Sequence, residues 1–161
     1  MFNYLCECSP IETRRQIDYL SSTPVFKIAE LLNSGQCVLK KGAISSLHHL
    51  GNLKTEFGPI GSLLPAAKSG ERKFLVSEIV PMLRANRTIP DGGLLQSIET
   101  IMKTEAKNEV DFNITLLSLN GEIIIKDGNK RTIAYYENRK NFNRTTSNYE
   151  VYLVESASNS T

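Results

Sequence analysis

The sequence predicts an α+β protein in which a mixed β-sheet with flanking helices follows a helical N-terminal extension. Three observations support this prediction. Helix-start signals and helical spacing dominate residues 1–50, loop-forming residues cluster over 51–72, and strand patterns alternate with helix patterns from residue 73 onward. We therefore expect a helical extension over residues 1–70 and an α+β domain over residues 71–161.

Length and composition fit one globular core. The chain has 161 residues, of which 40% are hydrophobic and 22% are charged, and its formal net charge is +2. So small a charge does not indicate nucleic-acid or membrane binding by field strength alone. We expect a cytoplasmic protein, because no stretch has the length of a membrane span and residues 1–10 lack the pattern of a secretion signal.

The cysteines and histidines do not form a recognisable metal motif. Cys6, Cys8 and Cys37 are an odd and sparse set, which does not indicate a disulfide framework. The spacing of the two N-terminal cysteines relative to His48 and His49 fits no common zinc pattern. Function is therefore expected from a site elsewhere in the chain.

Cap signals predict the helices of the extension. Ser9, Pro10 and Glu12 have the types and spacing of an N-cap, a first helical position and a capping-box acid, which predict a helix to about residue 20. A Thr-Pro pair at 23–24 predicts a second helix, and apolar spacing predicts a third over 43–50. These helices carry no evident chemistry, so we expect them to contact a protein partner.

The first elements of the domain are predicted to be a strand, a loop and a helix. An apolar run over residues 74–80 that ends at Pro81 predicts the strand. The loop over residues 82–93 carries Arg87, and apolar residues at helical spacing predict a helix over residues 93–107.

A hairpin and a corner between a strand and a helix follow. Alternating apolar residues over 111–119 predict a half-buried strand, and Asn120-Gly121 is a strong hairpin signal. Three successive isoleucines at 123–125 predict the returning strand. A helix to about residue 140 and a strand over residues 149–154 complete the expected domain.

The corner has the chemistry of an anion site. A strand that turns sharply into a helix leaves unpaired N–H groups at the helix start, and Gly128 would let another group approach them closely. Lys130 and Arg131 add two cations on the same turn. A phosphate placed there would meet N–H donors, the positive helix end and a guanidinium group.

The order of these elements resembles the ParB/sulfiredoxin fold over about residues 73–155. In that family a Gly-x-x-Arg motif at a helix start holds nucleotide phosphates, and here the motif is Asp127-Gly128-Asn129-Lys130-Arg131. The segment 75–81, the Asn86-Arg87 pair and the Ser97-Ile98 pair are similar to the family's opening strand, its Asn-x-Arg loop and a later helix. The resemblance implies nucleotide binding.

Departures from the family narrow the expected activity. Sulfiredoxins carry their catalytic cysteine where this chain has Asn129, so that chemistry is excluded. Chromosome-segregation ParB proteins continue into a helix-turn-helix domain that has no counterpart here, so we expect no DNA binding. Family members that phosphorylate free serine have a glutamate where this chain has Met82, and Glu78 is the residue that would replace it.

The resemblance implies a site for ATP or CTP together with Mg²⁺. Backbone N–H groups of Gly128, Asn129 and Lys130 would face the phosphates, and Arg131 would contact them through two N–H groups. Other side chains have implied roles: Thr132 as a cap or hydroxyl donor, Asp127 as a Mg²⁺ ligand or general base, Glu78 as a second catalytic carboxylate, and Arg87 as a cation that closes over the phosphates.

Several functions remain open at this point. An enzyme would use these residues, with Asp127, Arg131 and Glu78 as its catalytic groups, for phosphoryl transfer or nucleotide hydrolysis, whereas a nucleotide-sensing or protein-interaction module would bind without turnover. A second carboxylate near Asp127 would favour the enzyme, and nuclease activity is the weakest reading because paired carboxylates are not evident. The motif also resembles the loop of Fic and Doc transferases, but Ile123 stands where those proteins carry their histidine, and strands rather than helices flank the loop.

Overall fold

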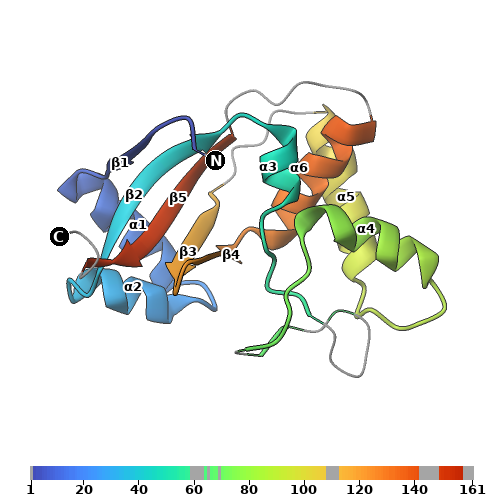
Figure 1. Cartoon of the computed structure of the whole chain (residues 1–161), viewed down its shortest axis with the longest axis horizontal. Helices are drawn as coiled ribbons and strands as arrows, with labels where there is room; N and C mark the ends of the chain where they lie inside the picture. The colour runs from blue at the N-terminus through green and yellow to red at the C-terminus, as the bar shows by residue number, and fades with distance from the viewer. Residues whose placement is uncertain are drawn as a thin grey trace.

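The computed structural model describes residues 2–58, 64, 66–68, 70–107, 113–141 and 149–157. This part of the chain forms a mixed five-stranded sheet and six helices, in the order β1 (Leu5–Glu7), α1 (Pro10–Ser21), α2 (Phe26–Asn33), β2 (Cys37–Ile44), α3 (Leu47–Gly51), α4 (Val76–Ala85), α5 (Leu94–Lys107), β3 (Thr115–Leu119), β4 (Glu122–Asp127), α6 (Asn129–Asn141) and β5 (Tyr149–Ser156) (Figure 1). The α+β class and the mixed sheet are thus confirmed.

The sheet has the order β1-β2-β5-β3-β4, so the central strand is the last one in the sequence. β5 pairs antiparallel with β2 from Ser156 opposite Cys37 to Tyr149 opposite Ile44, and it pairs parallel with β3. β3 and β4 form the predicted hairpin, whose turn has φ values of 53° at Asn120 and 79° at Gly121.

We predicted a helical extension over the first 70 residues, but this segment also contains two strands, β1 and β2. β1 and β2 are strands of the same sheet as β3, β4 and β5, so strands from both sides of the predicted boundary near residue 70 belong to one sheet. Residues 43 and 44 end β2, and the third helix begins only at Leu47. Pairing with β5, more than a hundred residues away, gives residues 37–44 the backbone partners that a short isolated strand lacks.

The strand predicted over residues 74–81 is also wrong, because most of this segment forms α4. The buried residues Val76, Ile79, Val80 and Leu83 have helical spacing and share one face. Glu78 caps the helix by accepting a hydrogen bond of 2.9 Å from the Leu75 N–H. Burial of this apolar face and the cap from Glu78 together outweigh the helix-breaking effect of Pro81, which lies inside the helix.

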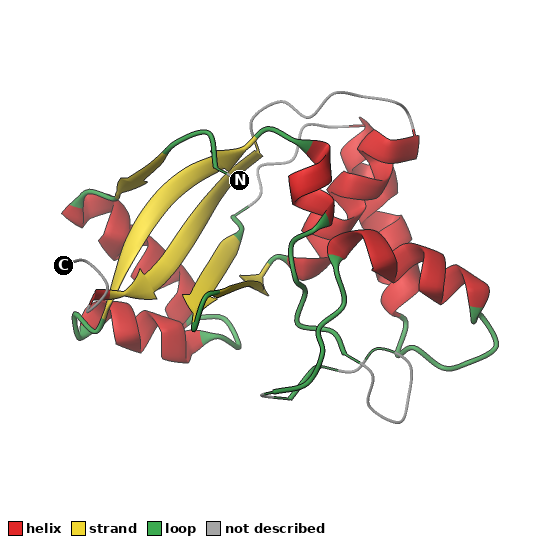
Figure 2. Cartoon of the chain, in the orientation of Figure 1, coloured by secondary structure: helices red, strands yellow, loops and turns green. Residues whose placement is uncertain are grey.

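The helices form two groups on the two sides of the molecule (Figure 2). α1 and α2, whose positions were predicted, pack their apolar faces on the sheet in one cluster of buried residues: Ile17, Leu20, Ile28, Ala29, Leu32, Leu39 and Val154. Residues of α3, α4, α5 and α6 belong to a second cluster with the opposite sheet face. The apolar faces of α1 and α2 are therefore used within the chain.

Candidate functional site

The predicted corner forms between β4 and α6, and residues 127–132 are called the β4–α6 corner below. β4 ends at Asp127, Gly128 has a φ of 94°, and α6 begins at Asn129. The Thr132 N–H donates to the Gly128 carbonyl at 2.9 Å, which is the first turn of the helix. The N–H groups of residues 129–131 precede that bond, so they have no partner within the helix.

Gly128 is required by packing. The Cδ1 methyl of Ile114 lies where a β-carbon on residue 128 would be placed, and the Asn113 carbonyl oxygen is 3.5 Å from that position. Ile114 is fully buried in the main core cluster. The side of Gly128 on which a β-carbon would stand is therefore filled by a side chain of the same protein, so packing alone explains the glycine.

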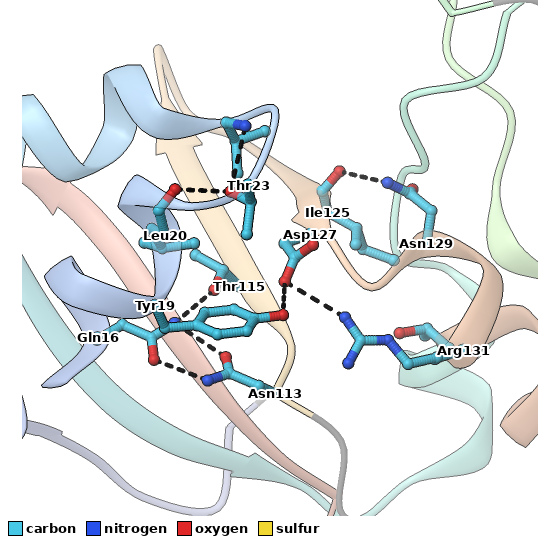
Figure 3. A network of polar contacts seen from close by, with 12 residues as sticks. Gln16, Tyr19, Leu20, Thr23, Asn113, Thr115, Ile125, Asp127, Asn129 and Arg131 are labelled. Atoms are coloured by element: carbon cyan, nitrogen blue, oxygen red, sulfur yellow. Dashed lines mark hydrogen bonds and ion pairs between the residues drawn. The ribbon is translucent and has the colours of Figure 1, made fainter.

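Asp127 and Arg131 are held together with a residue from α1 (Figure 3). One carboxylate oxygen of Asp127, Oδ2, accepts hydrogen bonds from the Tyr19 hydroxyl at 2.8 Å and from an Arg131 guanidinium nitrogen at 3.3 Å. Burial and the neighbouring Asp127 carboxylate raise the pKa of Tyr19. The phenol therefore stays protonated and donates to Asp127 at neutral pH.

A second polar contact fixes α1 beside the corner. The Gln16 amide is buried, exchanges two hydrogen bonds of 2.9 Å with the Asn113 amide, and donates a third of 2.9 Å to the Thr115 hydroxyl (Figure 3). Gln16 and Tyr19 are three residues apart and lie on the same helix face. α1 thus contacts the corner through Tyr19, and through Gln16 it contacts Asn113 and the first residue of β3, which pairs with Asp127.

The segment before α4 covers another side of the corner. The Glu56 N–H donates to the Asn129 side-chain oxygen at 3.1 Å, and the Asn129 side-chain nitrogen donates to the Ile125 carbonyl at 3.1 Å. The Glu56 carboxylate also lies 3.2 Å from the ammonium group of Lys126. The Asn129 side chain therefore connects the segment before α4 to the start of α6. These contacts use the side chain of Asn129 and not its backbone N–H.

Lys130 and Thr132, the other two residues of the corner, face opposite ways. Lys130 is exposed, so its ammonium group is accessible from solvent. Thr132 is fully buried, and its hydroxyl shares a 3.0 Å hydrogen bond with the Tyr149 hydroxyl. Thr132 therefore points into the core instead of toward a ligand at the corner.

Glu78 and Arg87 lie in other parts of the molecule. The Glu78 carboxylate caps α4 and forms an ion pair of 2.9 Å with Arg72, in a cleft of about 400 Å³. Arg87 lines a groove of about 420 Å³ between α4 and α5. Among the described residues that line these two cavities, none belongs to the β4–α6 corner, so neither side chain meets Asp127 there.

Asp127 is the one carboxylate among residues 127–132, so it is the residue of the corner that could contact a cation. Within the described ranges, no group of three or more His, Cys, Asp or Glu side chains is placed to hold a metal ion. One oxygen of Asp127 already accepts two hydrogen bonds. The Glu56 carboxylate also reaches the corner, where it accepts a hydrogen bond from the Asn129 side-chain nitrogen at 3.4 Å. A Mg²⁺ site usually uses one or two carboxylates together with the phosphates of its substrate.

Three residues at the corner were not found from the sequence: Gln16, Tyr19 and Glu56. For Gln16 a signal existed, since it lies beside Ile17 on the apolar stripe of α1, and a polar residue on such a stripe needs a buried partner. Tyr19 and Glu56 carry no comparable signal, because their contacts depend on how distant segments pack.

Comparisons with family models, with curated proteins and with solved structures give no match to this chain. Of the helices in the described residues, none has the length and apolar character needed to cross a membrane. Proposals about function therefore rest on the geometry of the corner.

Proposed function

We propose that this chain binds the phosphate groups of a nucleotide, ATP or CTP, at the β4–α6 corner. The observation that carries the proposal is the start of α6, where the N–H groups of residues 129–131 lie next to the exposed Lys130 and the half-buried Arg131. A helix start attracts anions because its N–H groups and its dipole are both positive there.

Arg131 retains donors for a phosphate. One guanidinium nitrogen contacts Asp127, whereas a guanidinium group has five N–H donors in all. The side chain is 29% exposed, so part of the group can be reached from solvent. A phosphate would replace or share the contact with Asp127, and a charge-assisted pair of this kind is stronger than a neutral hydrogen bond.

Binding without turnover is the form of the function that we favour. The carboxylate that would assist Asp127 in catalysis was expected to be Glu78, and Glu78 is engaged with Leu75 and Arg72 at the start of α4. The strand β4 directly before the corner argues against the degenerate Fic or Doc alternative, whose loop lies between helices. Relation to the ParB/sulfiredoxin fold remains part of the proposal, supported by the order β3, β4, corner, α6 and β5.

Calorimetric titration with ATP, ADP, CTP and GTP, with and without Mg²⁺, tests the proposal. We expect Arg131→Ala to weaken binding by about 1.5–3 kcal/mol, roughly tenfold or more, because one charge-assisted phosphate contact is lost. Arg87→Ala is the matched control, since Arg87 lines the groove between α4 and α5, and its affinity should equal that of the wild type.

Two outcomes would contradict the proposal. The first is that folded wild-type protein binds none of the four nucleotides. The second is that Arg131→Ala and Arg87→Ala bind a nucleotide equally well. Unfolding curves of both variants would show that each is folded at the temperature of the titration.

A further inference from the structure

The two edges of the sheet differ in how their backbone groups are used. At the β4 edge, the Ile125 N–H donates to the Lys54 carbonyl at 2.9 Å, so the segment before α4 covers part of this strand. At the other edge, β1 pairs with β2 on one side, and none of the described residues pairs with its other side (Figure 1). An unpaired strand edge is a template for pairing with another strand.

The hydrogen bonds between β1 and β2 show which groups of β1 face this open edge. Cys8 follows the strand and donates its N–H to the Leu39 carbonyl at 2.9 Å, and β1 continues in the same register. In an antiparallel pair, residues that bond to the neighbouring strand alternate with residues whose N–H and C=O groups point away from it. The backbone groups of Leu5 and Glu7 therefore point outward, where another strand can bind them.

Exposed apolar side chains are grouped at the same place. Tyr4 is 41% exposed, Leu5 is 40% exposed, and Ile11, in the first turn of α1, is 69% exposed. Three of the six large hydrophobic side chains that are exposed in the described part of the chain thus fall on β1 or next to it in the sequence. Grouped apolar residues beside an open strand favour contact with another protein surface over contact with water.

β1 is complementary to a second copy of itself. If two β1 strands pair antiparallel about a two-fold axis at Cys6, Leu5 of each copy lies opposite Glu7 of the other. Both residues have outward-facing backbone groups, so each such pair can exchange two hydrogen bonds. Glu7 is the single charged residue of β1, and in this register it faces a leucine, so like charges are not directly opposite each other.

We propose that β1 is a dimerisation edge, at which two copies of this chain pair through antiparallel β1 strands centred on Cys6. Their two five-stranded sheets then form one continuous sheet, and the same surface is used by both copies. The contact is short compared with the interfaces of about 1,200–2,000 Å² in stable complexes, so the dimer is weak and forms only at high concentration. β1 and β4 are the two ends of the strand order, so this proposal is independent of nucleotide binding at the β4–α6 corner.

Sedimentation equilibrium of the full chain under reducing conditions, at up to about 0.5 mM protein, tests for a weak dimer of this kind. Leu5→Glu places two carboxylates opposite each other across the contact, so it should weaken the dimer about tenfold. Adding Glu7→Lys to Leu5→Glu restores opposite charges and should recover the dimer. Phe26→Glu is the matched control, because Phe26 is similarly exposed, at 45%, but lies on α2, and its dimer should equal that of the wild type.

A thiol cross-link tests the position of the two-fold axis. Cys6 is exposed, and the proposed axis places it opposite Cys6 of the second copy. A short bismaleimide should therefore join two copies through Cys6, and mass spectrometry of the digested product identifies the joined peptides. Cys6→Ser should give no joined product, since Cys8 and Cys37 are partly buried.

Several results would overturn the proposal. A wild-type protein that is monomeric at every concentration would do so, and so would a dimer that Leu5→Glu and Phe26→Glu weaken equally or that neither changes. A double variant that stays monomeric, or a cross-link that does not involve Cys6, would overturn the pairing about Cys6. Circular dichroism of each variant shows that it is folded, which is expected because the hydrogen bonds between β1 and β2 do not use the backbone groups of Leu5 and Glu7.

Discussion

Gly128 and Ile114 fit together so closely that the Ile114 Cδ1 methyl occupies the place of a β-carbon on residue 128. Residue 128 also has a φ of 94°, in the left-handed region that favours glycine. We expect Gly128→Ala to lower the free energy of unfolding by about 2–3 kcal/mol, because it combines overpacking with a strained backbone. Urea unfolding followed by circular dichroism measures this change.

Gly35→Ala separates the two causes. Gly35 has a φ of 80° and no atom within 4 Å of the position of an added β-carbon, so this variant has the backbone strain alone. Its loss should be about 1 kcal/mol. Equal losses in the two variants would mean that Ile114 moves aside at no cost, contrary to the prediction.

Glu137 is a buried carboxylate that we expect to destabilise the folded protein at neutral pH. It is 1% exposed, its Oε1 has no hydrogen-bond partner in the described structure, and its Oε2 lies 4.0 Å from Lys140. Burial raises its pKa, and the fields of Lys140 and Arg84 oppose this only in part. The folded state thus holds a proton more tightly than the unfolded state does.

A raised carboxyl pKa means that this group's contribution to stability decreases as pH rises from the unfolded pKa through the folded pKa. Glu137→Gln removes the charge, so it should raise the free energy of unfolding at pH 7 by on the order of 1 kcal/mol, with little effect at pH 4. Urea unfolding at both values tests this. Glu30→Gln, on the exposed side of α2, is the control and should change stability at neither pH; a loss of stability in Glu137→Gln at pH 7 would refute the prediction.

Cys8 should react much more slowly than Cys6, although the two are neighbours. Burial, followed by the hydrogen bond with Glu12, raises the pKa of Cys8 to about 12, whereas Cys6 is exposed. At pH 8 only about 1 in 10⁴ Cys8 thiols would be ionised, and the thiolate is the reactive form. Tandem mass spectrometry of iodoacetamide-treated protein should find the label on Cys6 first, and in 8 M urea the difference should disappear. Equal labelling in the folded protein would contradict the assigned environment of Cys8.

Elements with strong local signals were predictable from the sequence. Ser9 caps α1 through a hydrogen bond of 3.2 Å from the Glu12 N–H, as the capping pattern indicated. Asn120 and Gly121 form the hairpin turn, and the corner at Gly128 separates β4 from α6 as predicted. Each of these features depends on residues that lie close together in the sequence, so it can be predicted from the local sequence pattern.

Features that depend on distant partners were not predictable in the same way. Residues 37–44 form a strand because β5 is available to pair with them, and Tyr19 reaches Asp127 because α1 packs on the sheet. The segment 76–85 carried two opposing local signals: β-branched residues with Pro81 favoured a strand, and the spacing of its apolar residues favoured a helix. The segment forms a helix because its apolar face then packs in the core.

The central place of β5 also has a consequence for the order of folding. β5 joins β2 to β3, so the five-stranded sheet cannot form until residue 156 has been synthesised. Until then β2 and β3 each present an unpaired edge, which is a site for aggregation or chaperone binding. Contacts between residues so far apart in the chain are slow to form. We therefore expect the hairpin β3–β4 to form early and closure of the sheet to be the late, slow step of folding.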